Sequence, residues 1–128
     1  MAHVLLVDDD PILLRVLQFW LTEASYTVTT HSTGEEALTT LTHAAYDLII
    51  LDRMLPDLDG LELCRQIRQT TATPILLLSA VAGTTHQAAA RAAGAAACLG
   101  KPVNPDTLLA QVATLVTAGR TGAGPSPQ

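Results

Sequence analysis

Residues 48–52 read Leu-Ile-Ile-Leu-Asp, a continuous apolar run over residues 48–51 that is followed by a carboxylate. A run in which every residue is apolar indicates a strand covered on both faces, as in a parallel sheet between helices. Two similar runs lie at residues 4–7 (Val-Leu-Leu-Val) and 75–78 (Ile-Leu-Leu-Leu). Weaker strand patterns lie at residues 26–30 and 96–99. The sequence therefore predicts five strands along the chain.

Helical patterns occupy the stretches that follow these runs. Asp10-Pro11 is typical of a helix start, with a capping carboxylate and proline at the first helical position. Thr33 and Glu36 form a capping-box pattern. Further helices are expected after Gly60, over residues 85–93 before Gly94, and after Asn104-Pro105.

The first helix carries apolar residues at helical spacing, which predicts one buried face. We expect this face to contain Leu14, Leu17 and Leu21, widened by Val16, Phe19 and Trp20, and we expect Phe19 and Trp20 to be core residues.

Strand and helix patterns alternate five times along the chain. Right-handed crossovers turn such an alternation into an open, doubly wound parallel sheet. Sheets of this kind hold their active site beyond the carboxyl ends of the strands. Chemically active side chains follow four of the predicted strands: Asp8, Asp9 and Asp10, then Asp52, then Ser79, then Lys101.

The composition describes a single small domain. The chain has 128 residues, of which 48% are hydrophobic and 3% aromatic, so its core must be aliphatic. The net charge of −5 argues against a nucleic-acid surface. Cys64 and Cys98 form no metal-binding or disulfide pattern, and no apolar run is long enough to span a membrane. We expect a cytoplasmic protein that binds neither membranes nor nucleic acid through this domain.

The residues at the strand ends suit phosphoryl chemistry. Gathered carboxylates repel one another, and a divalent cation such as Mg²⁺, which prefers oxygen ligands, relieves that repulsion. Asp8, Asp9 and Asp52 provide such ligands. Asp52 is also a potential nucleophile toward phosphorus, and the Lys101 ammonium and Ser79 hydroxyl are natural donors to a transferred phosphoryl group.

At this point the chain resembles the receiver domains of bacterial two-component response regulators. The resemblance runs from about Val4 to Val116. It rests on Val-Asp-Asp-Asp-Pro (7–11), Leu-Asp-Arg-Met-Leu-Pro-Asp-Leu-Asp-Gly (51–60), Leu-Ser-Ala (78–80) and Lys-Pro (101–102). The form of residues 54–60 is most similar to the subfamily joined to winged-helix DNA-binding domains.

The resemblance implies a flavodoxin-like (βα)5 fold with strand order 2-1-3-4-5, and a signalling switch. The phosphoryl donor would be a sensor histidine kinase or a histidine phosphotransfer protein. Residues 1–119 would form the receiver domain, and residues 120–128 a flexible Gly/Pro tail or the start of a linker. Such a domain is not an enzyme toward other molecules, because it catalyses only its own phosphorylation and dephosphorylation.

The resemblance also assigns roles to single residues. Asp52 would accept the phosphoryl group, and Asp9, Asp52 and the backbone carbonyl of Met54 would bind Mg²⁺ directly, with Asp8 acting mainly through a water molecule. Lys101 would pair with Asp52 and then with the phosphoryl oxygens, and Ser79 would bind the phosphoryl group as part of the switch. Asp10 is better interpreted as a helix cap. Apolar side chains at Met54 and Val81 predict slow loss of the phosphoryl group.

The chain departs from the family at the second switch position, where Cys98 replaces the usual Tyr or Phe. Ala96 and Ala97 stand where the winged-helix subfamily often has acidic residues, although Arg91 and Asp106 remain. These residues therefore predict an atypical output from the surface formed by the fourth helix, the fifth strand and the fifth helix. It is either plain alanine-rich packing or an apolar face that docks an effector domain or a second copy.

Two other functions stay open at the level of sequence. An aspartate-nucleophile phosphatase carries a DxD motif after its first strand, and Asp8-x-Asp10 fits that form. An interaction module that has kept the fold and lost phosphorylation is the other alternative. The filled acidic, hydroxyl and lysine positions favour the switch over both.

Overall fold

The computed structural model describes residues 2–80 and 84–120. Within these two ranges, five strands alternate with five helices, as the sequence predicts. Val81 and residues 121–128, on which two of the predictions above fall, lie outside them. In chain order the elements are β1 His3–Val7, α1 Pro11–Glu23, β2 Thr27–His31, α2 Gly34–Leu41, β3 Leu48–Asp52, α3 Gly60–Arg68, β4 Ile75–Ser79, α4 Thr84–Ala92, β5 Ala97–Gly100 and α5 Pro105–Arg120.

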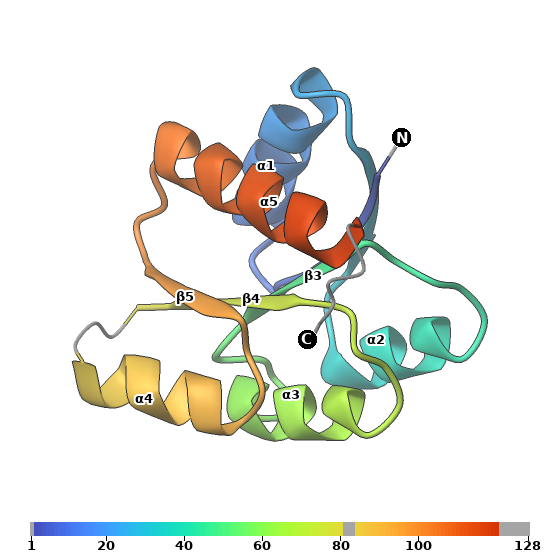
Figure 1. Ribbon diagram of the computed structural model, residues 1–128, viewed down its shortest axis with the longest axis vertical. Coiled ribbons are helices and arrows are strands. Elements are labelled where there is room, and N and C mark those ends of the chain that lie inside the picture. Colours follow the sequence, from blue (N-terminus) through green and yellow to red (C-terminus); the bar gives the residue numbers. More distant parts are fainter. Residues whose placement is uncertain (1, 81–83, 121–128) are drawn as a thin grey trace.

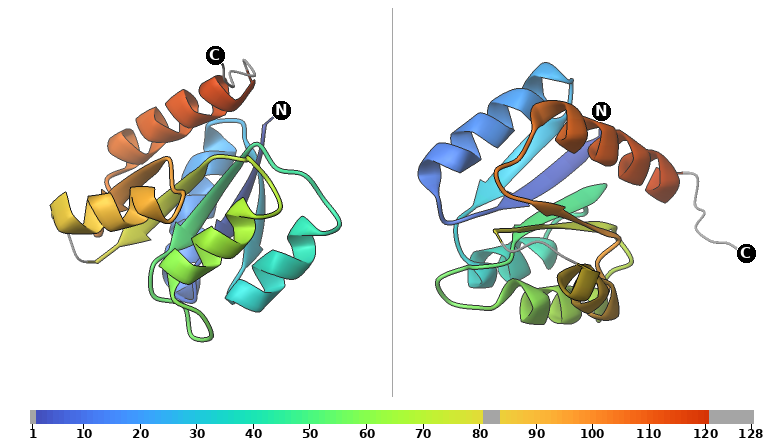
Figure 2. Two further views of the ribbon diagram at one scale, coloured as in Figure 1. Left: turned by 60° about the horizontal axis from the view of Figure 1, so that its bottom comes forward. Right: turned by 90° about the vertical axis from the view of Figure 1, so that its left-hand side faces the viewer.

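The strands form one parallel sheet in the order β2-β1-β3-β4-β5, which confirms the predicted topology. Helices α1 and α5 cover one face of the sheet, and α2, α3 and α4 cover the other (Figures 1 and 2). Every residue of β3 and β4 is buried, as continuous apolar runs require. No helix within residues 2–80 and 84–120 has the length and apolarity needed to cross a membrane.

Alternate residues of each strand pack into two separate hydrophobic cores, because successive side chains of a strand point to opposite faces of the sheet. Leu5, Val7, Ile49 and Leu51 pack toward α2, α3 and α4, whereas Val4, Leu6, Leu48 and Ile50 pack toward α1 and α5.

The predicted helix signals act as expected. The Asp10 carboxylate accepts hydrogen bonds from the backbone N–H groups of Ile12 and Leu13 at 3.0 and 3.3 Å. The Thr33 hydroxyl accepts from the Glu36 N–H at 3.1 Å, while the Glu36 carboxylate reaches back to the Ser32 N–H. The bounds of all five strands and of α4 differ from the predicted ones by one residue at one or both ends.

The prediction for the outer side of α1 is wrong. Phe19 is 62% exposed and Val16 is 36% exposed, whereas Leu17 and Leu21 are fully buried. Phe19 stands two positions beyond Leu17, which places it about 200° further round the helix. Trp20 is half-buried against the core, as predicted. Helix α1 therefore presents large apolar side chains to solvent.

The loop between β3 and α3 is tied to the start of α2 through Asp57. Its two carboxylate oxygens accept hydrogen bonds from the N–H groups of Gly34 and Glu35, each at 2.9 Å. These backbone hydrogen bonds lower the pKa of Asp57. A carboxylate at a helix N-terminus also interacts favourably with the helix dipole.

We therefore expect Asp57→Ala to lower the free energy of unfolding by about 0.5–1 kcal/mol at pH 7, the lower part of the range for capping, because the group is exposed. A lowered native pKa means that this contribution is present above the ordinary pKa of aspartate and is lost as the pH falls through the native value. Urea unfolding at pH 7 and at successively lower pH measures it. Glu23→Ala, which removes an exposed carboxylate at the end of α1, is the control. A difference that persists at the lowest pH would contradict the assignment.

Candidate functional site

The sheet register brings the predicted site residues to one edge. Val7 lies opposite Leu51, so Asp8 and Asp52 leave neighbouring strands side by side. Ser79 ends β4 and pairs with Gly100, so that Lys101 leaves β5 at the same edge. The four strand ends named by the sequence thus meet at the carboxyl edge of the sheet.

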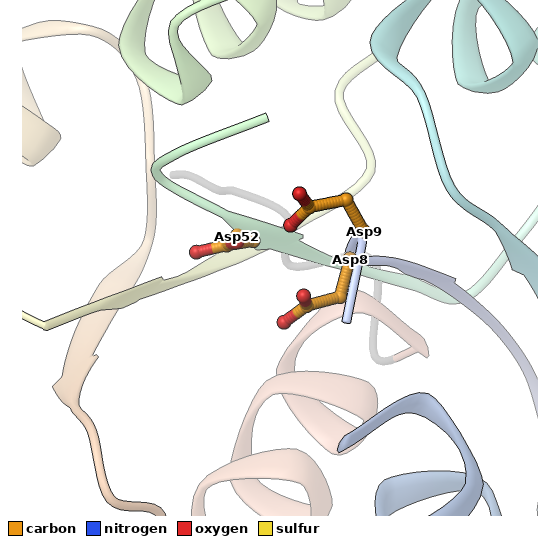
Figure 3. Close-up of side chains that lie close together, drawn as sticks. All are labelled: Asp8, Asp9 and Asp52. Carbon is orange, nitrogen blue, oxygen red and sulfur yellow. The ribbon is translucent and has the colours of Figure 1, made fainter. Parts of the chain in front are cut away.

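Three carboxylates gather at this edge. One oxygen each from Asp8, Asp9 and Asp52 lie within 4.8 Å of one another. Figure 3 shows the three side chains reaching from the ends of β1 and β3 toward the same side. Asp8 is fully buried and Asp52 is 4% exposed, whereas Asp9 is open to solvent. The cluster is therefore accessible from the side of Asp9.

Lys101 is the cation that joins the buried pair. Its Nζ lies 3.0 Å from Asp52 Oδ1 and 3.2 Å from Asp8 Oδ2. Burial acts to lower the pKa of Lys101, but the hydrogen bond with Asp52 and the charges of Asp8 and Asp52 outweigh it, so the pKa is raised. The ammonium is therefore held in its charged form.

One lysine does not fully compensate the acidic cluster. Burial is the largest influence on the pKa of Asp8 and raises it, helped by the charge of Asp52, while the N–H of Asp10 and the charge of Lys101 oppose the shift. The net result is a raised pKa, which means that the negative form of Asp8 is disfavoured in its surroundings. An added cation would stabilise the negative form of Asp8.

The donor set suits a hard divalent cation. All three clustered ligands are carboxylate oxygens, one of them exposed, which is the chemistry that Mg²⁺ accepts while it keeps water or phosphate oxygens as its other ligands. The predicted role of the Met54 carbonyl as a further ligand stays a prediction.

The backbone that follows Asp52 is held tightly. The Arg53 N–H donates to the Leu78 carbonyl, and the Arg53 carbonyl accepts from the Gly60 N–H, each at 2.7 Å. The Met54 N–H donates to Asp52 Oδ1 at 3.3 Å. A Cβ on Gly60 would lie 2.6 Å from Arg53 Cα, so only glycine permits this close approach. The loop therefore fixes the position of the Asp52 carboxylate.

Ser79 and Cys98 lie in different surroundings. Ser79 is buried beside the acidic edge and lines a cavity of about 130 Å³ with Arg53, Met54, Ala80 and His86. Cys98 lies within β5 opposite Leu77 and is half-buried, whereas Cys64 is buried. Burial raises the pKa of the Cys98 thiol, and the charge of Arg53 opposes that shift. Cys98 is therefore not part of the carboxylate cluster.

Three residues near the site have contacts that sequence patterns did not indicate. Asp57 caps α2, as described above. The Arg53 guanidinium donates a hydrogen bond to His86, which lies 33 positions further along the sequence. No local motif marks such a pair, because it forms only when α4 packs beside the loop after β3.

Comparisons with known proteins identify this arrangement. A doubly wound sheet with buried carboxylates and a lysine at its carboxyl edge defines a flavodoxin-like domain with an acidic site. Within that class, the chain belongs to the response regulator receiver domain family, whose model matches residues 4–113. It is a receiver domain of the two-component signalling systems, and the resemblance found in its motifs is confirmed.

Relatives and solved structures agree with this assignment. The chain is 40% identical to the response regulator ArlR of Staphylococcus epidermidis over 112 residues, which are 88% of this chain and 51% of that protein. It therefore spans about half the length of such relatives. The receiver domain of Francisella response regulator 1452 superposes with a TM-score of 0.89 at 31% identity, covering 93% of this chain and 99% of the other. The chemotaxis response regulator CheY4 of Vibrio cholerae gives 0.86 at 35% identity, covering 90% and 98%.

Proposed function

We propose that this chain is a phosphorylation-dependent switch that accepts a phosphoryl group on Asp52 from a histidine of a sensor kinase or a phosphotransfer protein, in a Mg²⁺-dependent reaction. The observation that carries the proposal is the Asp52 carboxylate, buried at the sheet edge, 3.0 Å from Lys101 Nζ and within 4.8 Å of two further carboxylates. The membership of the receiver domain family supports it.

The chemistry follows from this arrangement. An Asp52 oxygen attacks phosphorus, a P–O bond forms, the P–N bond to the donor imidazole breaks, and its electron pair stays on the imidazole nitrogen. Asp9, Asp52 and the Met54 carbonyl would hold Mg²⁺ directly, with Asp8 acting mainly through a water molecule, and the bound ion would neutralise charge on the carboxylates and the phosphoryl oxygens. Lys101 stays beside Asp52 and donates to the phosphoryl oxygens. Ser79, at the end of the neighbouring strand, supplies a hydroxyl donor.

The phosphatase alternative is less well supported. It needs Asp10 as a general acid two residues after Asp8, but the Asp10 carboxylate caps α1 by accepting hydrogen bonds from Ile12 and Leu13. Asp10 is thereby engaged in the fold of α1, whereas Lys101, Asp8 and Asp52 form the connected group.

The surface through which the switch would act on an effector domain or a second copy is also part of the proposal. We place it on the surface formed by α4, β5 and α5, where a cavity of about 200 Å³ is lined by Gln87, Arg91, Ala97, Cys98 and Gln111. An effector domain such as a winged-helix module, or a second copy, would bind there. We also place the protein in the cytoplasm, where free cysteines stay reduced, and we retain residues 1–119 as the receiver domain, followed by a tail or linker.

The proposed reaction is tested by intact-mass analysis after incubation with acetyl phosphate, with and without Mg²⁺. We expect one phosphoryl adduct on the wild type in the presence of Mg²⁺, and none on Asp52→Asn, because the nucleophilic oxygen is lost. Asp57→Asn is the matched control, since it changes another aspartate of the same loop. Equal labelling of wild type and Asp52→Asn would refute the assignment of Asp52, and no labelling of either would refute the switch.

Large apolar side chains are exposed on α1 and on the loop after β3. Among the described residues, Ile12, Phe19 and Met54 are 62–73% exposed, and Val16 is 36% exposed. Ile12 lies in the first turn of α1, beside the acidic edge, and Phe19 lies about 10 Å further along the same helix. A macromolecular phosphoryl donor that docks on this side would cover these side chains, and exposed apolar patches often mark such contacts.

We therefore expect Ile12→Ser combined with Phe19→Ser to slow phosphoryl transfer from an autophosphorylated sensor kinase by about tenfold or more, because the lost contacts weaken docking. Labelling by acetyl phosphate should stay unchanged, since that donor needs no docking surface. Kinases are first screened with the wild type to find one that transfers rapidly. The proposal for this surface fails if the double variant accepts the phosphoryl group from that kinase at the wild-type rate.

A further inference from the structure

One hydrogen bond connects the phosphoacceptor loop to α4. The Arg53 side chain, directly after Asp52, donates from Nη1 to His86 Nδ1 at 3.0 Å. His86 lies in the first turn of α4, and both side chains are half-buried. The Arg53 Nε also lies 3.8 Å from Asp59 Oδ1. Arg53 is therefore placed between the phosphorylation site and the helix.

The hydrogen bond determines which nitrogen of the His86 ring carries the proton. A guanidinium has only donors, so His86 Nδ1 must accept, and the ring must be neutral with its proton on Nε2. The Arg53 backbone is held on both sides by Leu78 and Gly60. Any response of Arg53 to its surroundings is thus confined to its side chain.

The pair borders the space that phosphorylation would disturb. Arg53 and His86 line the cavity of about 130 Å³ that Ser79 also lines. Phosphorylation of Asp52 replaces a carboxylate with one negative charge by a phosphoryl group with about two negative charges, and it brings three strong acceptor oxygens to the residue directly before Arg53. That group competes with the neutral imidazole for the guanidinium, and an anion is the stronger acceptor.

Helix α4 is anchored weakly, which makes one hydrogen bond matter. Its buried contacts come from alanines, with Ala90 almost fully buried and Ala89 partly buried against the core. Small side chains bury little apolar area, so they contribute little to holding a helix in place.

We propose that the Arg53–His86 hydrogen bond is the contact through which phosphorylation of Asp52 controls α4. This inference rests on the proposed function. In the unmodified chain the bond holds the first turn of α4. After phosphorylation Arg53 turns toward the phosphoryl group, His86 loses its donor, and α4 is released. The pair thereby replaces the switch function of the Tyr or Phe that receiver domains usually carry at the position of Cys98.

The test is hydrogen exchange of the α4 amides, measured with and without beryllofluoride and Mg²⁺. His86→Phe keeps a ring and removes the acceptor, and Arg53→Met keeps the stem and removes the donors. We expect both to raise exchange of α4 in the free chain by about fivefold or more, with little further effect of beryllofluoride. In the wild type, beryllofluoride should give a similar rise. His86→Asn, which retains an acceptor near Nδ1, should behave like the wild type, and so should His43→Phe.

Two outcomes overturn the inference. One is a free His86→Phe chain in which the α4 amides exchange as in the wild type. The other is a His86→Phe or Arg53→Met chain that responds to beryllofluoride as fully as the wild type does. The acetyl phosphate labelling of the same preparations separates this failure from a failure of the proposed function. A wild type that gains no adduct refutes the switch itself, whereas a labelled wild type with an unaltered His86→Phe response refutes only the role of this contact.

Discussion

The bridge from Lys101 to two buried carboxylates is the interaction on which the site depends. Lys101 leaves the end of β5, yet its Nζ contacts Asp52 on β3 and Asp8 after β1. The side chain must therefore reach past β4, which it can do only if the strands stand in the observed order. Without this cation, two adjacent buried carboxylates would repel each other in surroundings that disfavour charge. The contacts of Lys101 thus require the observed strand order and register, and they also balance the charge of the buried carboxylates.

The same bridge supports the phosphoryl chemistry proposed for this site. Lys101 neutralises only part of the cluster, and Asp9 stays exposed beside the buried pair. A cation and an anionic group can both enter where the charges are incompletely balanced. The tight loop after Asp52, closed by Gly60, would keep the proposed nucleophile in place while these groups bind.

Much of this arrangement is predictable from the sequence because it follows from local rules. Continuous apolar runs require two covered faces, and side chains after parallel strands must meet at one edge, so Asp8, Asp52 and Lys101 could be placed together without coordinates. The caps at Asp10 and Thr33 are equally local. The solvent exposure of Phe19 was not predicted, because an α1 that is apolar on several sides does not reveal which side faces the sheet. The Arg53–His86 bond was not predictable either, since it depends on how α4 packs beside a distant loop.

The most direct test of this account is the stability of Lys101→Met without Mg²⁺. The substitution keeps most of the length of the side chain and removes its charge, leaving Asp8 and Asp52 buried and uncompensated. We predict that urea unfolding gives a free energy lower than that of the wild type by about 2–3 kcal/mol, and that adding Asp8→Asn to Lys101→Met restores most of the loss. A Lys101→Met chain as stable as the wild type would show that the bridge does not hold the site together.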